Sequence, residues 1–198
     1  MRGICVSLAA AAWLVASAQA SPNDIQLKPD PSAAEVLTKT RTTEHFSFFF
    51  AEDEKSLEDV FAVLEKNYSP IVAAFKMVLP ERTRVEIYPD IGRYQRRVFG
   101  RLIGDWAIGN FSPGDGVLRM VSPNNCGKSH TYQGVVQVAA HEFVHRVIFE
   151  YRGRTREGLP NWLDEGTAEY YSSDFSPRDK LAVQEAVQAD RIPRSLSE

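Results

Sequence analysis

One pentapeptide constrains this chain more than any other feature. His141-Glu142-Phe143-Val144-His145 places two histidines four positions apart, so on a helix both imidazoles project from the same face, one turn apart. That spacing allows both rings to bind one zinc ion. Glu142 lies beside the pair, where its carboxylate can take a proton from a zinc-bound water. The pattern therefore predicts a catalytic metal centre.

The residues around the pentapeptide predict a buried helix. Apolar side chains fill most of the positions around the motif between Val135 and Phe149, so we expect a helix over Val135–Arg152 that is covered nearly all round. Ionisable groups on a buried helix need a metal or charged partners. A polar helical face that carries His, Glu and His by chance is the simpler alternative, and the apolar surroundings argue against it.

A catalytic zinc site needs a third protein ligand and one open coordination position. The segment 159–171 follows the first motif, and its Pro160 suits the first turn of a helix. Glu165 and Glu169 are four positions apart and share a helical face. Asp164 projects about 100° away from Glu165. Glu165 is the expected third ligand, and Asp164 and Glu169 are the alternatives.

Together the two segments resemble the gluzincin metallopeptidases, in particular the peptidase MA-like domains of exported bacterial proteins. The matching residues are His141-Glu142-x-x-His145 and Pro160-x-Trp162-Leu163-x-Glu165-Gly166-x-Ala168-Glu169-Tyr170. The gap between the second histidine and Glu165, residues 146–164, has the thermolysin-type length. The resemblance implies one catalytic zinc ion, Glu142 as general base, and three ligands: His141, His145 and Glu165. It also implies that Glu169 hydrogen-bonds a ligand histidine, with His141 the expected one.

The resemblance further implies a zincin-like α+β fold, in which a mixed β-sheet packs on the helix that carries the pentapeptide and a short helical lobe follows. The domain is expected over residues 44–198, with a sheet and active-helix lobe over 44–152 and a helical lobe over 153–198. Only residues 166–198 follow Glu165, whereas gluzincins usually continue into a larger helical lobe.

Hydrophobic periodicity predicts the other elements. Strands are expected at His45–Ala51, Arg84–Tyr88 and Val117–Val121, and helices at 57–75, 91–101 and 179–190. Pro70 is expected to kink or restart the first of these helices. Four arginines on the helix over 91–101 form either a site for acidic partners or a solvated basic face, and the basic face is the simpler interpretation.

The resemblance also indicates residues that contact substrate. In gluzincins the strand before the active helix is the sheet edge that pairs with the substrate backbone. That place is taken by Val117, Leu118, Arg119, Met120 and Val121, which form either this edge or an interior strand. Four side chains are candidates for stabilising a transition-state oxyanion: His130, Tyr151, Tyr170 and Tyr171.

Residues 1–20 have the pattern of a secretory signal peptide. Arg2 precedes an apolar run, and Ala18-Gln19-Ala20 is a cleavage motif. We expect cleavage after Ala20 and export to the bacterial periplasm or the extracellular space, with no stable membrane span after cleavage. Without cleavage the segment would be an anchor. Residues 21–43, which contain three prolines, are expected to form an extended tether.

Composition limits the remaining classes. The chain has 198 residues, 43% of them hydrophobic, which suits one domain with a substantial core. The net charge of −3 gives no indication of a nucleic-acid partner. A peptide or protein substrate is what the resemblance to gluzincins implies. Loss of Cys5 with the signal peptide leaves Cys126 as the single cysteine and excludes an intrachain disulfide.

The sequence thus predicts an exported zinc metallopeptidase. The alternative is a domain that keeps the zinc scaffold and binds envelope peptides or proteins without cleaving them. The short region after Glu165 favours this alternative. Glu142 argues against it, because a binding module has no need of a base beside the metal.

Overall fold

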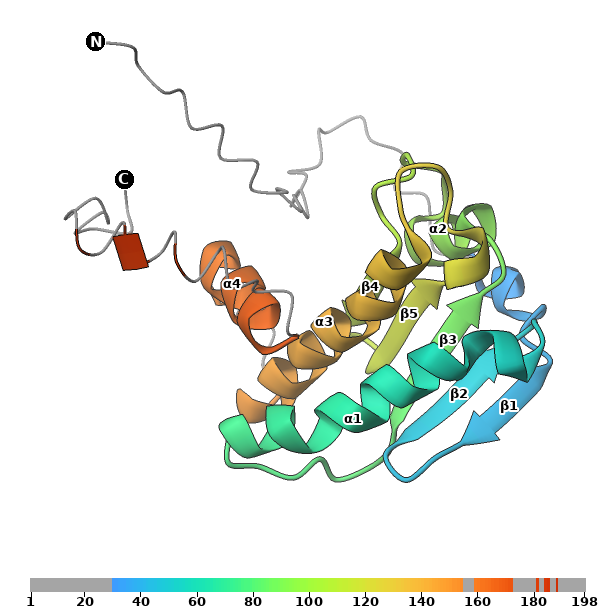
Figure 1. Cartoon of the computed structure of the whole chain (residues 1–198). Helices are drawn as coiled ribbons and strands as arrows, with labels where there is room; N and C mark the ends of the chain where they lie inside the picture. Colours follow the sequence, from blue (N-terminus) through green and yellow to red (C-terminus); the bar gives the residue numbers. More distant parts are fainter. Residues whose placement is uncertain (1–29, 155–158, 173–180, 182–183, 186–187, 189–198) are drawn as a thin grey trace, which may run out of the picture.

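The structure is a computed structural model that describes residues 30–154 and 159–172, together with positions 181, 184, 185 and 188. The described residues form an α+β domain with a mixed five-stranded sheet and four α-helices (Figure 1). No described helix is long and apolar enough to cross a membrane. The predicted signal peptide lies outside the described residues, and so does most of the helix predicted over 179–190, whose four described positions are helical.

The sheet has the strand order β1-β2-β3-β5-β4. Its strands are β1 (Lys39–Thr42), β2 (Phe46–Phe50), β3 (Thr83–Tyr88), β4 (Gly109–Ser112) and β5 (Val117–Val121). The three central strands run parallel, and β1 and β4 pair antiparallel with their neighbours at the two edges. The central strands coincide with the three predicted ones, because long apolar side chains make their pattern strong. The two edge strands were not predicted.

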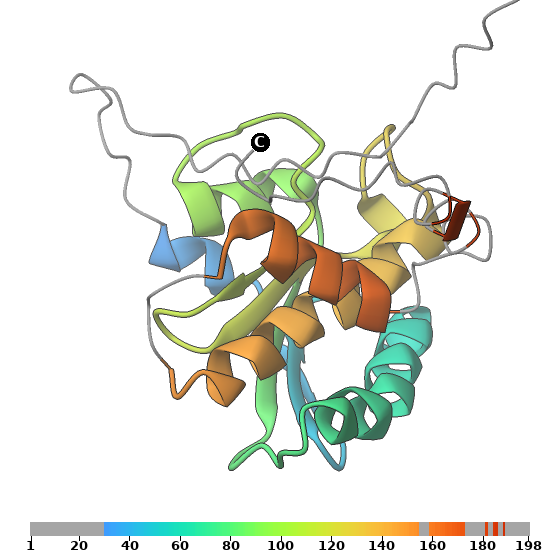
Figure 2. The same cartoon turned by 90° about the vertical axis from the view of Figure 1, so that its left-hand side faces the viewer.

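The helices are α1 (Glu58–Ala74), α2 (Ile91–Phe99), α3 (Tyr132–Tyr151) and α4 (Asn161–Tyr171). Short 3₁₀ turns lie at η1 (Pro31–Ala34), η2 (Glu54–Leu57) and η3 (Pro123–Asn125). Helices α1 and α3 pack against each other, and α4 crosses α3 (Figure 2). Helix α1 continues through Pro70, so the expected restart of the helix does not occur. Gly100, in the left-handed conformation with φ of 68°, ends α2.

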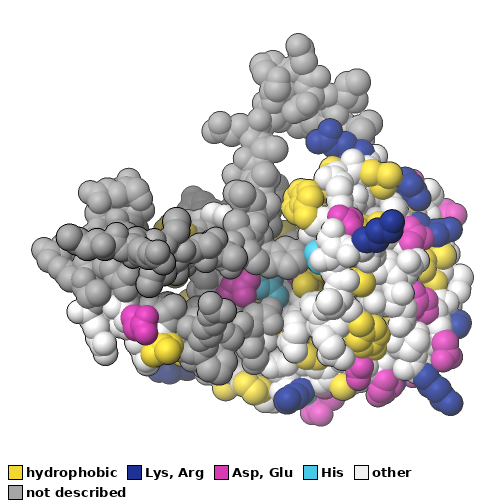
Figure 3. All heavy atoms as spheres, turned by 45° about the horizontal axis from the view of Figure 1, so that its top comes forward, with side chains coloured by type: hydrophobic (Ala, Val, Ile, Leu, Met, Phe, Trp, Pro, Cys, Tyr) yellow, Lys and Arg dark blue, Asp and Glu magenta, His cyan; other side chains and the backbone are white. Residues whose placement is uncertain are grey.

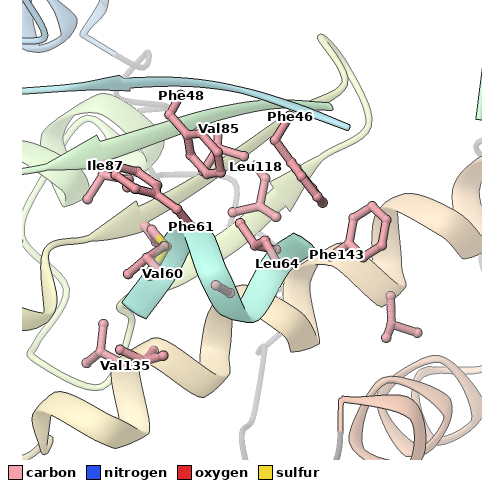
Figure 4. Packing of buried hydrophobic residues seen from close by; sticks show 14 of the residues in the cluster. Phe46, Phe48, Val60, Phe61, Leu64, Val85, Ile87, Leu118, Val135 and Phe143 are labelled. Carbon is pink, nitrogen blue, oxygen red and sulfur yellow. The ribbon is translucent and has the colours of Figure 1, made fainter. Parts of the chain in front are cut away.

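The core lies between the sheet and the pair formed by α1 and α3. Alternation along β2 buries Phe46, Phe48 and Phe50 on the same face. The Phe48 ring lies 4.5 Å from Phe61 of α1, and the Phe46 ring lies 5.1 Å from Phe143 of α3 (Figure 4). Each such phenylalanine stabilises the fold by roughly 1.5–3 kcal/mol through burial. This packing fixes α3, and with it the pentapeptide, against the sheet.

The described part of the predicted tether belongs to the domain. Strand β1 pairs with β2 from Lys39 opposite Phe50 to Thr42 opposite Ser47. Its side chains are mostly exposed, so no apolar pattern marks it in the sequence. Main-chain pairing holds it, together with ion pairs from Arg41 to two glutamates of η2 and α1. The prediction of an extended tether is therefore wrong for residues 39–42.

Strand β5 is an interior strand. It lies between β3 and β4, and all five of its side chains, Val117 to Val121, are buried. The expectation that these residues form the substrate-binding edge is wrong, and the interior alternative is correct. Strand β4 occupies the edge instead. Its four residues carry little apolar pattern, which is why the sequence did not reveal it.

Candidate metal centre

Helix α3 brings the two histidines of the pentapeptide together. The side chain of its N-cap residue, Thr131, accepts a hydrogen bond from the backbone N–H of Gly134, and buried apolar residues surround the motif. The Nε2 atoms of His141 and His145 are 3.2 Å apart. His141 is 9% exposed. Two basic ring nitrogens therefore approach the same point on the side of α3 that faces α4.

Helix α4 places a carboxylate at the same point. The Glu165 Oε2 atom lies 3.3 Å from Nε2 of His141 and 3.7 Å from Nε2 of His145. In a tetrahedral zinc site with bonds of 2.0–2.2 Å, two ligand atoms are about 3.3–3.6 Å apart. The three observed separations, 3.2, 3.3 and 3.7 Å, lie within about 0.1 Å of this range, so the three atoms could hold a zinc ion. Among the described residues they form a possible metal-binding group, and Figure 3 shows histidine and acidic side chains adjacent at the surface.

The outer nitrogen of each histidine faces a second carboxylate. The Nδ1 atom of His145 lies 3.0 Å from Oδ1 of Asp164, and Nδ1 of His141 lies 3.8 Å from Oε1 of Glu169. Glu169 is therefore beside the expected histidine, at ion-pair distance. Asp164, considered from the sequence only as an alternative ligand, binds the outer nitrogen of the other histidine. Both contacts leave the Nε2 atoms directed toward Glu165.

Charge within the cluster is strongly coupled. Burial acts to lower the pKa of His145, but hydrogen bonds with Asp164 and Glu165 outweigh it and raise this pKa to about 10. Burial acts to raise the pKa of Glu165, but the two histidines lower it to about 2. The three groups thus hold each other by ion pairing. A metal ion would take the place of the shared protons.

Glu142 is anchored by the edge strand β4. Its Oε2 atom accepts a hydrogen bond of 2.8 Å from the backbone N–H of Phe111 in β4. Burial raises the pKa of Glu142, and the positive charge of His145 and His141 opposes this rise. A carboxylate with a raised pKa is a stronger base at neutral pH. The contact with Phe111 fixes one carboxylate oxygen of Glu142, and the role of proton acceptor stays a prediction.

A glycine allows β4 to approach α3 this closely. A Cβ atom at Gly109 would overlap Cγ1 of Val138 and would lie 3.3 Å from Cγ of Glu142. Only a residue without a side chain fits between the strand and the helix there. The need for glycine at position 109 depends on which strand packs against α3, so no pattern in the neighbouring sequence predicts it.

No known protein family, curated protein or solved structure matches this chain. The assignment of the metal centre therefore rests on the geometry and the chemistry of its own residues.

The four candidates for oxyanion stabilisation make different contacts in the structure. Two aromatic rings contact Phe75: Tyr151 at 5.5 Å and Tyr171 at 5.4 Å between ring centroids. Tyr170 is 58% exposed on α4 and contacts Tyr171. His130 pairs through Nε2 with the backbone oxygen of Asp105. None of these contacts selects one candidate for this role, which stays a prediction.

Cys126 lies in the segment before α3. The thiol is free and buried, and Sγ is 3.8 Å from the backbone oxygen of His130. It packs as a small apolar residue with a weak S–H donor.

Proposed function

We propose that this protein is a zinc-dependent metallopeptidase of the gluzincin type. The observation that carries the proposal is the convergence of three ligand atoms from His141, His145 and Glu165, separated by 3.2–3.7 Å, with the Glu142 carboxylate held beside them. A zinc ion in such a site acts as a Lewis acid and lowers the pKa of a bound water. Residues of the chain itself transfer the proton, orient the histidines and bind the peptide.

Glu142 is the proposed general base. Its carboxylate receives the proton of the attacking water and delivers it to the leaving amine. The N–H of Phe111 holds one of its oxygens and so fixes the orientation of the group. Asp164 and Glu169 act on the outer nitrogens of the histidines, which keeps both imidazoles in the orientation that binds metal.

Strand β4 is the proposed substrate edge. In an antiparallel pair, residues whose main-chain groups point toward the partner strand alternate with residues whose main-chain groups point away from it. The Val121 N–H donates to the Ile108 oxygen, so the main-chain groups of Ile108 point toward β5. Gly109 and Phe111 therefore direct their main-chain groups away from β5, in agreement with the bond from Phe111 to Glu142. The Gly109 N–H and the carbonyl groups of both residues are positioned to pair with an extended peptide. Such a peptide would lie along the side of the domain that holds Glu142.

The test is hydrolysis of a peptide library of mixed sequence by the full chain supplied with zinc, followed by mass spectrometry. We expect cleavage that a chelator stops and that added zinc restores. Glu142→Gln is expected to keep its zinc and lose cleavage by roughly 10²-fold or more, because the amide cannot accept the proton.

Two results would contradict the proposal. One is cleavage by Glu142→Gln at the wild-type rate. The other is a folded, zinc-loaded wild-type chain that cleaves no member of the library, which would favour the domain that binds peptides without cleaving them.

A further inference from the structure

A hollow lies at the edge strand, on the sheet face opposite α3. It has a volume of about 190 Å³, roughly six times the volume of a water molecule in the liquid, and so has room for a side chain. The residues that line it come from α2, from β4 and β5, and from the turn that joins these strands: Arg97, Val98, Asn110, Ser112, Asp115 and Arg119 among them.

Alternation along β4 connects this hollow to the proposed substrate edge. Gly109 and Phe111 face α3. Gly109 lies against Val138 of this helix, and the Phe111 ring lies 5.5 Å from the ring of Phe149. Asn110 and Ser112 therefore project to the opposite face, into the hollow. A peptide paired with β4 alternates in the same way. Its side chains on that face would lie beside Asn110 and Ser112, at the mouth of the hollow.

One arginine of the hollow is already bound by two carboxylates. Arg119 is 3% exposed. Its Nε atom donates to Glu86 over 2.9 Å, and its two terminal nitrogens donate to the two oxygens of Asp115. Glu86 also accepts from Tyr88 and Arg84. This network neutralises its own charges and leaves Asp115 engaged with Arg119.

Arg97 is the arginine with capacity left. Its Nε atom is buried and has no hydrogen-bond partner in the part of the chain that the structure describes. Its Nη2 atom lies 3.9 Å from Asp115, beyond hydrogen-bond distance, and Asp115 is already bound by Arg119. A buried donor without a partner costs free energy. A guanidinium offers five N–H groups, and a carboxylate is the partner that it binds best.

We propose that this hollow is a subsite for an aspartate or glutamate side chain of the bound peptide, with Arg97 as the specificity-determining residue. The inference rests on the proposed function for the peptide's path along β4. Arg97 takes no part in the chemistry, since it lies on the sheet face opposite the metal centre. The expected signature is therefore a preference among substrates, with the cleavage of neutral peptides unaltered.

The experiment compares peptide libraries that differ only in carrying Glu or Gln at one fixed position. We expect the wild-type chain to favour Glu over Gln at one such position, by roughly ten- to hundredfold in kcat/KM, the range of a hydrogen bond to a charged group. Arg97→Gln is expected to reduce this ratio to near one, and Arg97→Lys, which keeps the charge, to retain part of it. Arg93→Gln is the matched control, because Arg93 is on α2 but pairs with Asp90 outside the hollow.

Cleavage without any preference for Glu, or a preference that Arg97→Gln keeps, would overturn this inference and leave the proposed function standing. The same libraries are also measured by binding to the zinc-loaded Glu142→Gln chain. Binding that favours Glu and depends on Arg97, from a protein whose wild-type form cleaves nothing, would keep the subsite and overturn the peptidase. Circular dichroism and zinc content verify that each variant is folded.

Discussion

Each histidine of the metal centre uses its two ring nitrogens differently. The Nε2 atoms face each other and Glu165, and the Nδ1 atoms face Asp164 and Glu169. A carboxylate on the outer nitrogen holds the ring and makes the inner nitrogen a better ligand. The contact of Asp164, at 3.0 Å, is closer than that of Glu169, at 3.8 Å. We therefore expect Asp164 to contribute more than Glu169 to the proposed metal binding.

This difference predicts the effect of removing either carboxylate. Asp164→Ala is expected to weaken zinc binding by roughly 10–100-fold, and Glu169→Ala by less. Competition with a chelating fluorophore measures both affinities. A larger loss of zinc affinity in Glu169→Ala than in Asp164→Ala would contradict the greater role expected for Asp164.

At this scale the sequence predicts which three side chains come together, but only part of the set of carboxylates around them. The spacing of His141, Glu142 and His145 is local to one helix, so the shared face follows from helix geometry alone. The partner of His145 depends on how α4 crosses α3, which no local pattern encodes. Asp164 was therefore considered only as a rival ligand.

At the scale of elements, the contact between β4 and α3 holds Glu142 in place. The strand touches the helix at Gly109 and donates to Glu142 from Phe111. Hydrophobic alternation predicts where a strand is, but strand order depends on contacts between distant segments. The sequence therefore locates β5 correctly but leaves open whether it is the edge or an interior strand, and the edge position belongs to β4.

A pair of alanine substitutions tests the contact at Gly109. Gly109→Ala is expected to destabilise the fold by about 1–3 kcal/mol, because the added methyl group overlaps Val138. Gly114→Ala, in the adjoining hairpin, is the control and is expected to change stability by less than about 0.5 kcal/mol, since its nearest neighbour is 4.0 Å away. Urea unfolding measures both. Equal stability of the two variants would contradict the close approach of β4 to α3.

The last turns of α3 depend on an ion pair that responds to pH. Arg146, whose side chain is 4% exposed, donates to Glu150 over 2.6 Å. Burial acts to raise the pKa of Glu150, but Arg146 and Arg154 outweigh it and lower this pKa in the folded protein. The pair therefore contributes its full stability above the unfolded pKa of about 4.5, and this stability is lost as the pH falls through the lower folded value.

Glu150→Gln tests this pH dependence. We expect a loss of roughly 1–3 kcal/mol at pH 7, because a charged donor keeps only a neutral partner. The difference from the wild-type chain should shrink below about pH 4.5, where the wild-type glutamate also becomes protonated. Urea unfolding across pH 3–7 gives the comparison. A difference that does not vary with pH would show that the ionised form of Glu150 makes no contribution.

At the scale of the whole molecule, apolar packing forms the core, and polar segments such as strand β1 extend the sheet at its edges. The α+β class follows from the apolar strands and from α1 and α3, whose patterns are strong in the sequence. The sheet is mixed because its two edge strands, β1 and β4, pair antiparallel with their neighbours. Strand β1 is held by main-chain pairing and by Arg41, and such contacts leave no apolar trace. The start of the domain was consequently predicted too late in the chain.

The zinc content of the purified full chain, measured by elemental mass spectrometry after zinc is supplied and the excess removed, tests the metal centre most directly. We predict about one zinc per folded wild-type chain, little in Glu165→Ala, and wild-type content in Glu142→Gln. Full occupancy in Glu165→Ala would move the third ligand to Asp164 or Glu169. A folded wild-type chain that holds no zinc would contradict the metal centre and the peptidase built on it.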